Sequence, residues 1–582
     1  MPLFQGLLAL WELHPKALPF APRDPIPAPI QTALAKRGIS SQAELEAFLE
    51  PDWNLVADPY QLPDLPKGLF HFHRAIQRKD FIYAVADYDV DGTAAAALLG
   101  RFLKGIGHPT NRFWLHIPNR HQEGYGISQS ALEEAYRRGT GLFIALDCGT
   151  KESEKIRQLQ AKGIPTLVLD HHAVEPGQFG PRADAFINPQ RPDSAYPNRY
   201  LSATAVTYQF LRAYQASYGT DFPLEQEIDL VALSLLADIM PIQGENRTLI
   251  QLGLRYFPQA LRPGLHALME KAGVPLHRPP RSREVVFQIV PRLNSAGRLK
   301  SARYALYLLY HSDWVQDLPK VAHYLDELNR ERQRLQEAAL QAALTQLGVS
   351  TPEASPTALV AASPSWEKGV IGLVAAKLVE RFYKPAVVFT QNPDGSWTGS
   401  ARSPEGIPLP EVLAQVHRMA SFSYFKAGGH ERAAGVTIGP QDLETFQMAF
   451  SQACASYPVP VRREVIDAVV EPEQLADPDL VEWCERFEPI GQGSEAPRFL
   501  VQGLTPDFLD GQFCLRHATS LFFPIKWDRL ERERLEPFLK QQGCKPISAI
   551  VTPRWGVGRR IELRLRDILP NLPPLGQNGE FS

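Results

Sequence analysis

Carboxylates at alternate positions follow an apolar run early in the chain. Asp87, Asp89 and Asp91 come directly after residues 81–86, a run typical of a buried β-strand. Two like charges about 4 Å apart repel by roughly 4 kcal/mol at an effective dielectric constant of about 20. Gathered carboxylates therefore need protonation or bound divalent cations. Oxygen and imidazole ligands favour manganese or magnesium over a structural zinc.

The same pattern recurs at two later apolar runs. Asp147 ends the run at 142–146, and Asp170-His171-His172 ends the run at 165–169. The carboxyl ends of parallel strands share one edge of a sheet, where open α/β sheets bind ligands. We therefore expect the three groups to converge. Asp238, at the end of a later apolar segment, is a fourth candidate ligand.

These acidic residues also have other interpretations. A calcium EF-hand loop starting at Asp87 would need a glutamate at its twelfth position, which is Leu98, and a helix rather than a strand before it. A surface turn carrying acidic residues is the second alternative, and the two further clusters argue against it. For Asp238, or for either histidine alone, the alternative is an ordinary solvated side chain.

Composition restricts the class of protein. A chain of 582 residues predicts three or four domains. With 61 basic and 64 acidic residues, bulk charge does not predict a nucleic-acid partner, so such a partner would need local basic patches. The five cysteines form no C-x-x-C pair, which fits reduced cytoplasmic thiols. We expect no signal peptide and no transmembrane helix.

The order of apolar runs predicts an α/β protein. Between residues 70 and 180, strand and helix patterns alternate, which indicates a parallel, doubly wound sheet. A further strand is expected at 112–117. A capping box of Ser130 and Glu133 is expected to open one helix. The helices of this region are expected at 93–106, 130–138 and 152–162.

Several domains are expected along the chain. Residues 313–347 are polar and helix-favouring, and a long connecting helix or a surface helix would fit them equally. The expected boundaries are 1–69 for an N-terminal extension, 70–312 for the first α/β domain, 313–350 for the connecting helix, 351–455 for a second α/β domain, 456–568 for a small β-barrel and 569–582 for a disordered tail.

Glycine-rich and arginine-rich segments are candidates for phosphate contacts. Residues 399–403 and 428–430 are interpreted as turns whose backbone N–H groups and side chains would suit an anion. Residues 292–298 place two arginines around a polar centre. The alternatives are ordinary turns and, for 292–298, a loop held by ion pairs.

Together these residues resemble the DHH phosphoesterase superfamily. The resemblance covers about residues 30 to 567 in the superfamily's order. Residues 87–92, 147–149, 170–172 and 237–238 are similar to its four motifs, and 428–435 to its companion DHHA1 domain. Four further segments resemble the bacterial members that degrade single-stranded DNA. They are 120–126, 291–298, 399–403 and 489–499.

The resemblance implies a single-stranded-DNA-specific 5′–3′ exonuclease of DNA repair and recombination, which uses two Mn²⁺ or Mg²⁺ ions. Asp170 would orient His171, His172 would lie beside the scissile phosphate, and Asp91 would belong to the catalytic group. We expect Asp147 to bridge both ions. The implied metal ligands are Asp87, Asp89, Asp147, His171 and Asp238.

The resemblance also implies where DNA would bind. Strand-end and phosphate contacts are expected from both α/β domains, and the last domain would be an oligonucleotide-binding (OB) barrel. A helicase and a single-strand-binding protein are the expected partners of a cytoplasmic monomer. The expected substrate-binding residues are Arg120, Arg292, Asn294, Arg298, Ser400, Arg402, Gly428, Gly429 and His430.

Small departures from the superfamily pattern leave every implied ligand in place. Ala86 and Ser494 replace a usual glycine and asparagine, and Lys300-Ser301 stands where an acidic residue is typical. Two rival functions stay open. One is a DHH phosphodiesterase acting on cyclic dinucleotides or very short RNA, and the other is a non-catalytic scaffold that binds DNA or replication proteins.

Overall fold

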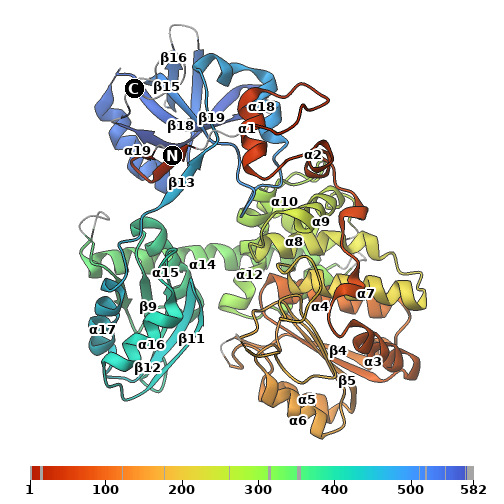
Figure 1. Ribbon diagram of the computed structural model, residues 1–582. Helices are drawn as coiled ribbons and strands as arrows, with labels where there is room; N and C mark the ends of the chain where they lie inside the picture. The colour runs from red at the N-terminus through yellow and green to blue at the C-terminus, as the bar shows by residue number, and fades with distance from the viewer. Residues whose placement is uncertain are drawn as a thin grey trace. The chain divides into compact units, whose positions relative to one another are not determined.

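The computed structural model of the chain, drawn in Figure 1, comprises two compact units. Unit 1 comprises Met1–Leu45, Gln333–Phe487 and Ala496–Ser582, and unit 2 comprises Glu46–Arg332 and Glu488–Glu495. Within these units the structure describes residues 3–13, 17–120, 122–175, 177–260, 262–311, 316–349, 355–509, 512–517, 521–543, 545–570 and 572.

Unit 2 is built on a five-stranded parallel sheet in the order β4-β3-β5-β6-β7. The predicted doubly wound α/β fold is therefore confirmed, and the apolar runs that precede the acidic clusters form its central strands. The short β7 was not predicted. The strands are β3 (Phe81–Ala86), β4 (Phe113–His116), β5 (Thr140–Leu146), β6 (Thr166–Leu169) and β7 (Ala185–Ile187).

Helices cover both faces of this sheet because alternate strand residues point to opposite sides. Ile82 and Ala84 join the core under α3 (Leu65–Arg78), α4 (Val90–Gly105) and α7 (Ala203–Tyr218). Tyr83 and Val85 join the core under α5 (Gln129–Arg137) and α6 (Ser153–Ala161). The predicted capping box at Ser130 is wrong. Ser128 is the N-cap residue of α5 and accepts from the Ala131 N–H, while the Ser130 hydroxyl donates to Glu123.

Further helices complete unit 2. The long polar stretch forms one helix, α14 (Leu318–Leu347), which passes from unit 2 into unit 1 between Arg332 and Gln333. Residues 313–315 and 350 of the predicted connecting segment lie outside the described residues. Helix α2 (Gln42–Leu49) passes from unit 1 into unit 2 between Leu45 and Glu46. The other helices of unit 2 are α8 (Ile228–Ala237), α9 (Gly244–Tyr256), α10 (Pro263–Ala272), α11 (Ser282–Glu284), the π-helical turn Val285–Ile289, α12 (Val290–Leu299) and α13 (Arg303–Tyr310).

The second α/β region, in unit 1, has a mixed sheet in the order β11-β12-β10-β9-β8, in which only β8 and β9 pair in parallel. The glycine-rich segments predicted as turns are strands instead: 399–402 lies in β10 and 428–430 ends β11. The elements are β8 (Leu359–Ala362), α15 (Lys368–Phe382), β9 (Ala386–Gln391), β10 (Trp397–Arg402), α16 (Leu409–Met419), β11 (Phe425–His430), β12 (Ala433–Ile438) and α17 (Leu443–Ala455).

The last region of unit 1 closes into a barrel, as predicted. Strands β15-β16-β17-β19-β18 are paired in that order, and β18 also pairs with β15. A ring of five strands in which β17 and β19 run parallel is a Greek-key barrel of the OB kind. The elements are β14 (Ala468–Val469), α18 (Pro478–Glu485), β15 (Phe499–Leu509), β16 (Gln512–His517), β17 (Leu521–Lys526), α19 (Arg529–Gln542), β18 (Ile547–Trp555) and β19 (Ile561–Leu569).

The start of the chain packs on this barrel. Strand β2 (Leu10–Leu13) pairs with β1 (Leu3–Gln5) and, in parallel, with β13 (Arg463–Ile466). The buried Asp567 carboxylate accepts hydrogen bonds from the Leu8 and Ala9 N–H groups and from the Trp11 indole, the last at 2.7 Å. Helix α1 (Ala28–Lys36) belongs to the same unit.

Among the described residues, no helix is long and apolar enough to cross a membrane. A disordered tail is predicted for 569–582. Residues 571 and 573–582 of this tail lie outside the described residues.

Candidate active site

The acidic turn after β3 is shaped by hydrogen bonds to its own backbone. The Asp87 N–H donates to Leu146 O of the neighbouring strand at 3.3 Å. Asp89 is the N-cap of α4 and accepts from the Gly92 N–H at 3.1 Å. A side chain at Gly92 would overlap the Asp87 backbone, so glycine is required there. The turn therefore presents Asp87 and Asp89 at the carboxyl edge of the sheet.

Asp147 follows β5 with an unusual backbone. Its φ of 57° lies in the left-handed region, which Asp tolerates better than most residues but still at a cost of about 1 kcal/mol or more. The Asp147 N–H donates to Leu169 O at 3.0 Å, and the Tyr125 hydroxyl donates to Asp147 O at 3.3 Å. These bonds hold the strained residue with its buried carboxylate at the sheet edge.

The segment after β6 supplies two imidazoles. The Asp170 carboxylate accepts from the backbone N–H of His171 at 2.7 Å and from His172 Nδ1 at 2.8 Å. On its other oxygen it accepts from the Thr150 N–H and hydroxyl, at 2.9 and 2.6 Å. The side chain that Asp170 orients is thus that of His172, and not that of His171 as expected.

The three strand ends and the end of α8 meet in unit 2. His171 Nε2 lies 3.2 Å from Asp147 Oδ1, 3.5 Å from Asp238 Oδ2 and 3.8 Å from Asp91 Oδ2. Potential ligand atoms also lie within 4.8 Å of one another in the group Asp87, Asp89 and Asp147. The predicted convergence of the four clusters is therefore confirmed.

Burial and mutual repulsion oppose the charges in this cluster. Burial, followed by the charges of neighbouring aspartates, raises the pKa of Asp87, Asp147 and Asp238 well above the usual range. Burial also raises the pKa of Asp89. Burial lowers the pKa of His171, which favours a neutral imidazole able to bind a metal.

The Asp170–His172 pair behaves differently. Burial opposes the charged form of both groups, but their mutual attraction outweighs it. The pKa of Asp170 lies well below its usual range, and the pKa of His172 is raised to about 9. His172 is therefore a cation at neutral pH beside the carboxylate cluster.

The cluster fits divalent cations. Asp87 Oδ1 and Asp147 Oδ1 are buried and have no hydrogen-bond partner among the described residues. A buried, unpartnered carboxylate oxygen is costly unless a cation or proton satisfies it. The donor set of carboxylate oxygens with one imidazole suits Mn²⁺ or Mg²⁺.

Asp91 differs from the other aspartates because both of its oxygens are already engaged. It accepts from the N–H groups of Ala203 and Thr204, at 2.7 and 2.8 Å, and from the Thr204 hydroxyl at 2.7 Å. These donors form the first turn of α7, so Asp91 joins the start of α4 to the start of α7.

Comparisons with known proteins agree with this geometry. Residues 81–235 match the family profile "DHH family, N-terminal domain", and residues 355–456 match "DHHA1 domain". The chain is 30% identical over 495 residues to the single-stranded-DNA-specific exonuclease RecJ of Dickeya dadantii, covering 82% of this chain and 84% of that protein. The chain belongs to the RecJ family.

Other RecJ proteins show the same likeness. The RecJ of Thermus thermophilus is 32% identical over 430 residues, which cover 74% of this chain and 60% of that protein. The crystal structure of RecJ in complex with Mn²⁺ from Thermus thermophilus aligns with a TM-score of 0.76 at 25% identity, covering 93% of this chain and 75% of that one. A crystal structure of exonuclease RecJ bound to manganese aligns with a TM-score of 0.58 at 29% identity, covering 69% of this chain and 96% of that one.

Four of the expected DNA-binding residues lie in unit 2. The Arg120 guanidinium lies 5.0 Å from the ring centroid of Tyr88, which is part of the acidic turn. Asn294 accepts from the Val90 N–H at 3.1 Å, and Arg292 pairs with Asp326 at 2.9 Å. Arg298 lies in the last turn of α12. Asn294 therefore supports the ligand turn directly, and Arg292 has a structural ion pair.

The remaining candidates lie in unit 1. On β10, Arg402 Nη1 donates to the Ser400 hydroxyl at 2.9 Å. Gly428, Gly429 and His430 are exposed on β11, the edge strand of its sheet. The acidic cluster belongs to unit 2, so the convergence of these residues with it stays a prediction.

Sequence reasoning did not identify several residues of the site. Thr150 holds Asp170, and the Asn188 amide donates to Thr150 Oγ1 at 3.2 Å and to His172 O at 2.9 Å. The Gln190 amide donates to His171 O. Thr150 follows the segment 147–149 directly, which was the available signal. Asn188 and Gln190 follow β7, a strand too short to stand out in the sequence.

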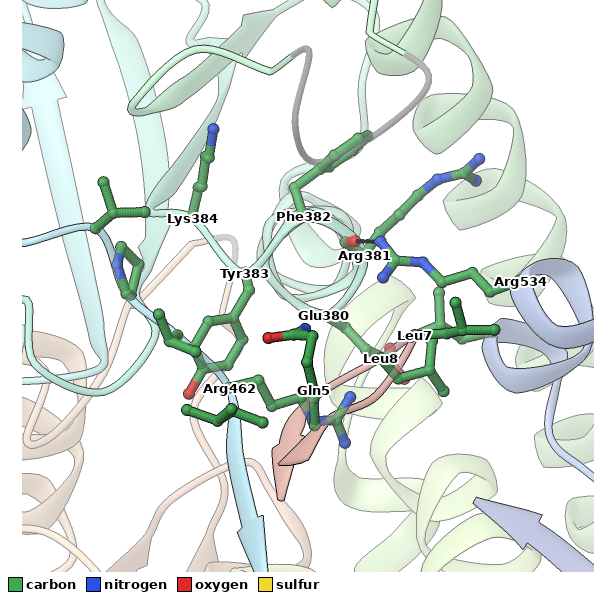
Figure 2. Close-up of a pocket in the computed structure, with 16 residues that line it drawn as sticks. Gln5, Leu7, Leu8, Glu380, Arg381, Phe382, Tyr383, Lys384, Arg462 and Arg534 are labelled. Carbon is green, nitrogen blue, oxygen red and sulfur yellow. Dashed lines mark hydrogen bonds between the residues drawn. The ribbon is translucent and has the colours of Figure 1, made fainter. Parts of the chain in front are cut away.

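A separate pocket of about 380 Å³ lies in unit 1 (Figure 2). Its lining comes from the β1–β2 region, the end of α15, residues 459–462 and α19, and includes Arg381, Lys384 and Arg534. Arg534 donates to Arg381 O at 2.7 Å. None of the predicted site residues lines this pocket, so the chemistry expected from the sequence belongs to the carboxylate cluster.

Proposed function

We propose that this RecJ-family chain is a single-stranded-DNA-specific exonuclease that removes nucleotides from the 5′ end and uses Mn²⁺ or Mg²⁺. The gathering of aspartates and His171 at one sheet edge carries the proposal, because such a group binds divalent cations. The activity for which its RecJ relatives are named supports the substrate, and the manganese complexes of solved RecJ structures support the ion.

The carboxylates and the imidazole of the cluster are the proposed ion ligands. Asp87, Asp89, Asp147, His171 and Asp238 would hold two ions, which when bound would supply Lewis-acid assistance to phosphodiester hydrolysis. We assign Asp147 as the shared ligand because it belongs both to the group with Asp87 and Asp89 and to the group with His171.

We assign His172 the role of contacting the scissile phosphate. Its Nδ1 is held by Asp170, and its Nε2 lies 3.3 Å from the Tyr125 hydroxyl. With Nδ1 engaged, the cationic ring can offer the Nε2 proton to a phosphate oxygen, which would orient the diester and stabilise developing charge. Asp170 would keep the ring charged and fixed. Asp91 would act by positioning α4 against α7.

The DNA strand would be held by Arg120 and Arg298 in unit 2, with Arg292 and Asn294 keeping that surface in shape. Ser400, Arg402, Gly428, Gly429 and His430 would contribute from unit 1. Contacts to phosphates make binding fall with increasing salt. We also propose that the protein acts as a cytoplasmic monomer, with a helicase and a single-strand-binding protein as partners, which co-purification would test.

The decisive experiment is a time course on 5′-labelled and 3′-labelled single strands with Mn²⁺, with blunt duplex and dinucleotides as competing substrates. Early release of the 5′ label only from single strands would support the proposal. Equal digestion of duplex would contradict the strand selectivity. Activity confined to dinucleotides would favour a small-substrate phosphodiesterase.

A further inference from the structure

The loop that follows the candidate ligand Asp238 has a strained backbone. Ile239 has a φ of 55°, in the left-handed region, which a β-branched residue rarely adopts, and its side chain is 63% exposed. The Ile239 and Met240 N–H groups donate to Leu236 O and Leu235 O, which ends α8 in a Schellman motif where glycine is usual. Such a conformation persists only where its surroundings fix it.

The far side of this loop is fixed by a segment that comes from much later in the chain. The Ile242 N–H donates to Gln492 O at 2.8 Å, and the Gln243 amide donates to Gly493 O at 3.0 Å. Gly491 packs so closely that an added Cβ would lie 2.7 Å from Ile242 Cδ1. Residues 488–495 therefore hold the loop by backbone, side-chain and packing contacts.

The segment 488–495 is itself firmly held in unit 2. The buried Arg247 of α9 donates to Glu488 O at 3.0 Å, to Pro489 O at 3.1 Å and to Ser494 Oγ at 3.2 Å. Ser282 donates from its hydroxyl to the Glu488 carboxylate at 2.7 Å. The residues on either side of the segment, Phe487 and Ala496, belong to unit 1.

We propose that residues 488–495, with Arg247 and Ile242, are a positioning device for the metal ligand Asp238. By fixing Ile242 and Gln243, the segment holds the strained turn at Ile239 and thereby the direction in which Asp238 faces the cluster. This inference rests on the proposed metal-dependent function. It assigns a role to the 489–493 motif that the ligand set leaves without one.

The test is a Mn²⁺ titration of the metal-free full chain by calorimetry, without DNA. Gly491→Ala should raise the Mn²⁺ dissociation constant about tenfold, the scale seen when groups that orient metal ligands are lost. Ile242→Val removes only the methyl group that the new Cβ would meet, so it should raise the Mn²⁺ dissociation constant less than Gly491→Ala does. The double variant, in which the overlap is gone, should bind Mn²⁺ as Ile242→Val does.

Gly100→Ala is the matched control. Its Cβ would lie 2.6 Å from Leu115 Cδ1, a similar overlap in unit 2 but in α4, away from the loop after Asp238. This variant should lower the melting temperature without changing Mn²⁺ binding. If Gly491→Ala does not fold, Gln243→Ala replaces it, because it removes only the exposed side-chain hydrogen bond to Gly493 O. Gln243→Ala should also raise the Mn²⁺ dissociation constant.

The inference is overturned by an unchanged Mn²⁺ dissociation constant in folded Gly491→Ala and Gln243→Ala, by an equal rise in Gly100→Ala, or by a double variant that binds Mn²⁺ no better than Gly491→Ala. A wild-type chain that binds Mn²⁺ but degrades no DNA would contradict the exonuclease and leave this inference standing. A wild-type chain that binds no Mn²⁺ would overturn both.

Discussion

Asp147 combines two unfavourable features in one residue. Its backbone is left-handed, and its buried carboxylate faces other carboxylates. Both features cost folding free energy, and both place a charge where a cation would be bound. The position after β5 was predictable because a carboxylate ending an apolar run can only lie at the sheet edge. The strain was not predictable, because no local residue pattern specifies a positive φ at an aspartate.

The substitution Asp147→Asn should separate activity from stability. Asparagine tolerates the left-handed region and removes one repelling charge, so the metal-free protein should melt at a higher temperature. Loss of a shared metal ligand should slow hydrolysis at least about a hundredfold, since metal assistance supplies several kcal/mol and each 1.36 kcal/mol is about tenfold in rate. Single-strand binding measured by fluorescence anisotropy should persist, and losing it together with hydrolysis would indicate misfolding.

The Asp170–His172 pair predicts a pH-dependent stability in EDTA. A histidine whose folded pKa is raised to about 9 contributes stability that is fully present below its ordinary pKa of 6.5 and is lost as pH rises through 9. The difference in unfolding free energy between wild type and His172→Gln should therefore shrink between pH 6.5 and pH 9.5. Urea titrations at both pH values measure it, and a constant difference would show that the pair is not coupled.

At the scale of elements, Asp91 joins two helices whose sequences lie far apart. Its carboxylate, in the first turn of α4, satisfies the first N–H groups of α7. The resemblance implies metal ligands at Asp87 and Asp89 and a catalytic residue at Asp91, whereas the carboxylate of Asp91 accepts hydrogen bonds from the start of α7. That division depends on where α7 begins in space, which no short-range pattern encodes.

Asp91→Ala should destabilise unit 2 by about 2 kcal/mol, the upper range for loss of a helix cap, because buried N–H groups lose their acceptor. Thr204→Val is the matched variant, since it removes only one hydroxyl donor to the same carboxylate and should cost less. Urea unfolding of both metal-free variants measures the difference. Equal losses would show that the hydroxyl, rather than the capped backbone, supports α7.

The glycine-rich segments show why some elements were assigned wrongly. Glycine usually weakens a strand, so the sequence of 399–403 and 428–430 favours turns. In the sheet, a Cβ at Gly399 would lie 2.5 Å from the Phe389 ring of the paired strand, and Gly428 and Gly429 lie on an exposed edge. Gly399 and Gly429 permit close approach within strands, whereas a Cβ at Gly428 would contact nothing. Only the tertiary partner reveals that difference.

At the scale of the whole molecule, folding and metal binding should be coupled through pH. The raised pKa values of Asp87, Asp147 and Asp238 mean that the metal-free fold retains protons that the unfolded chain releases. Their contribution is present below the ordinary aspartate pKa of 3.8 and is lost as pH rises through the raised values.

Mn²⁺ should therefore stabilise the protein more at pH 8 than at pH 6. At a concentration one hundred times its dissociation constant, an ion adds about 2.7 kcal/mol to the stability of the form that binds it. Melting temperatures in EDTA and in Mn²⁺ at both pH values measure the gain, with Asp147→Asn as the control that should lose most of it. An equal gain at both pH values would contradict a carboxylate origin.

The hydrogen bonds that Leu8, Ala9 and Trp11 donate to the Asp567 carboxylate have a consequence for synthesis on the ribosome. Strand β2 gains its parallel partner β13 only when residues 463–466 emerge, and the Trp11 indole gains its acceptor only with residue 567. Domains otherwise tend to fold in the order in which they are made. Residues 8–11 are thus translated long before their final neighbours, and a nascent chain halted before residue 567 should leave them accessible to protease.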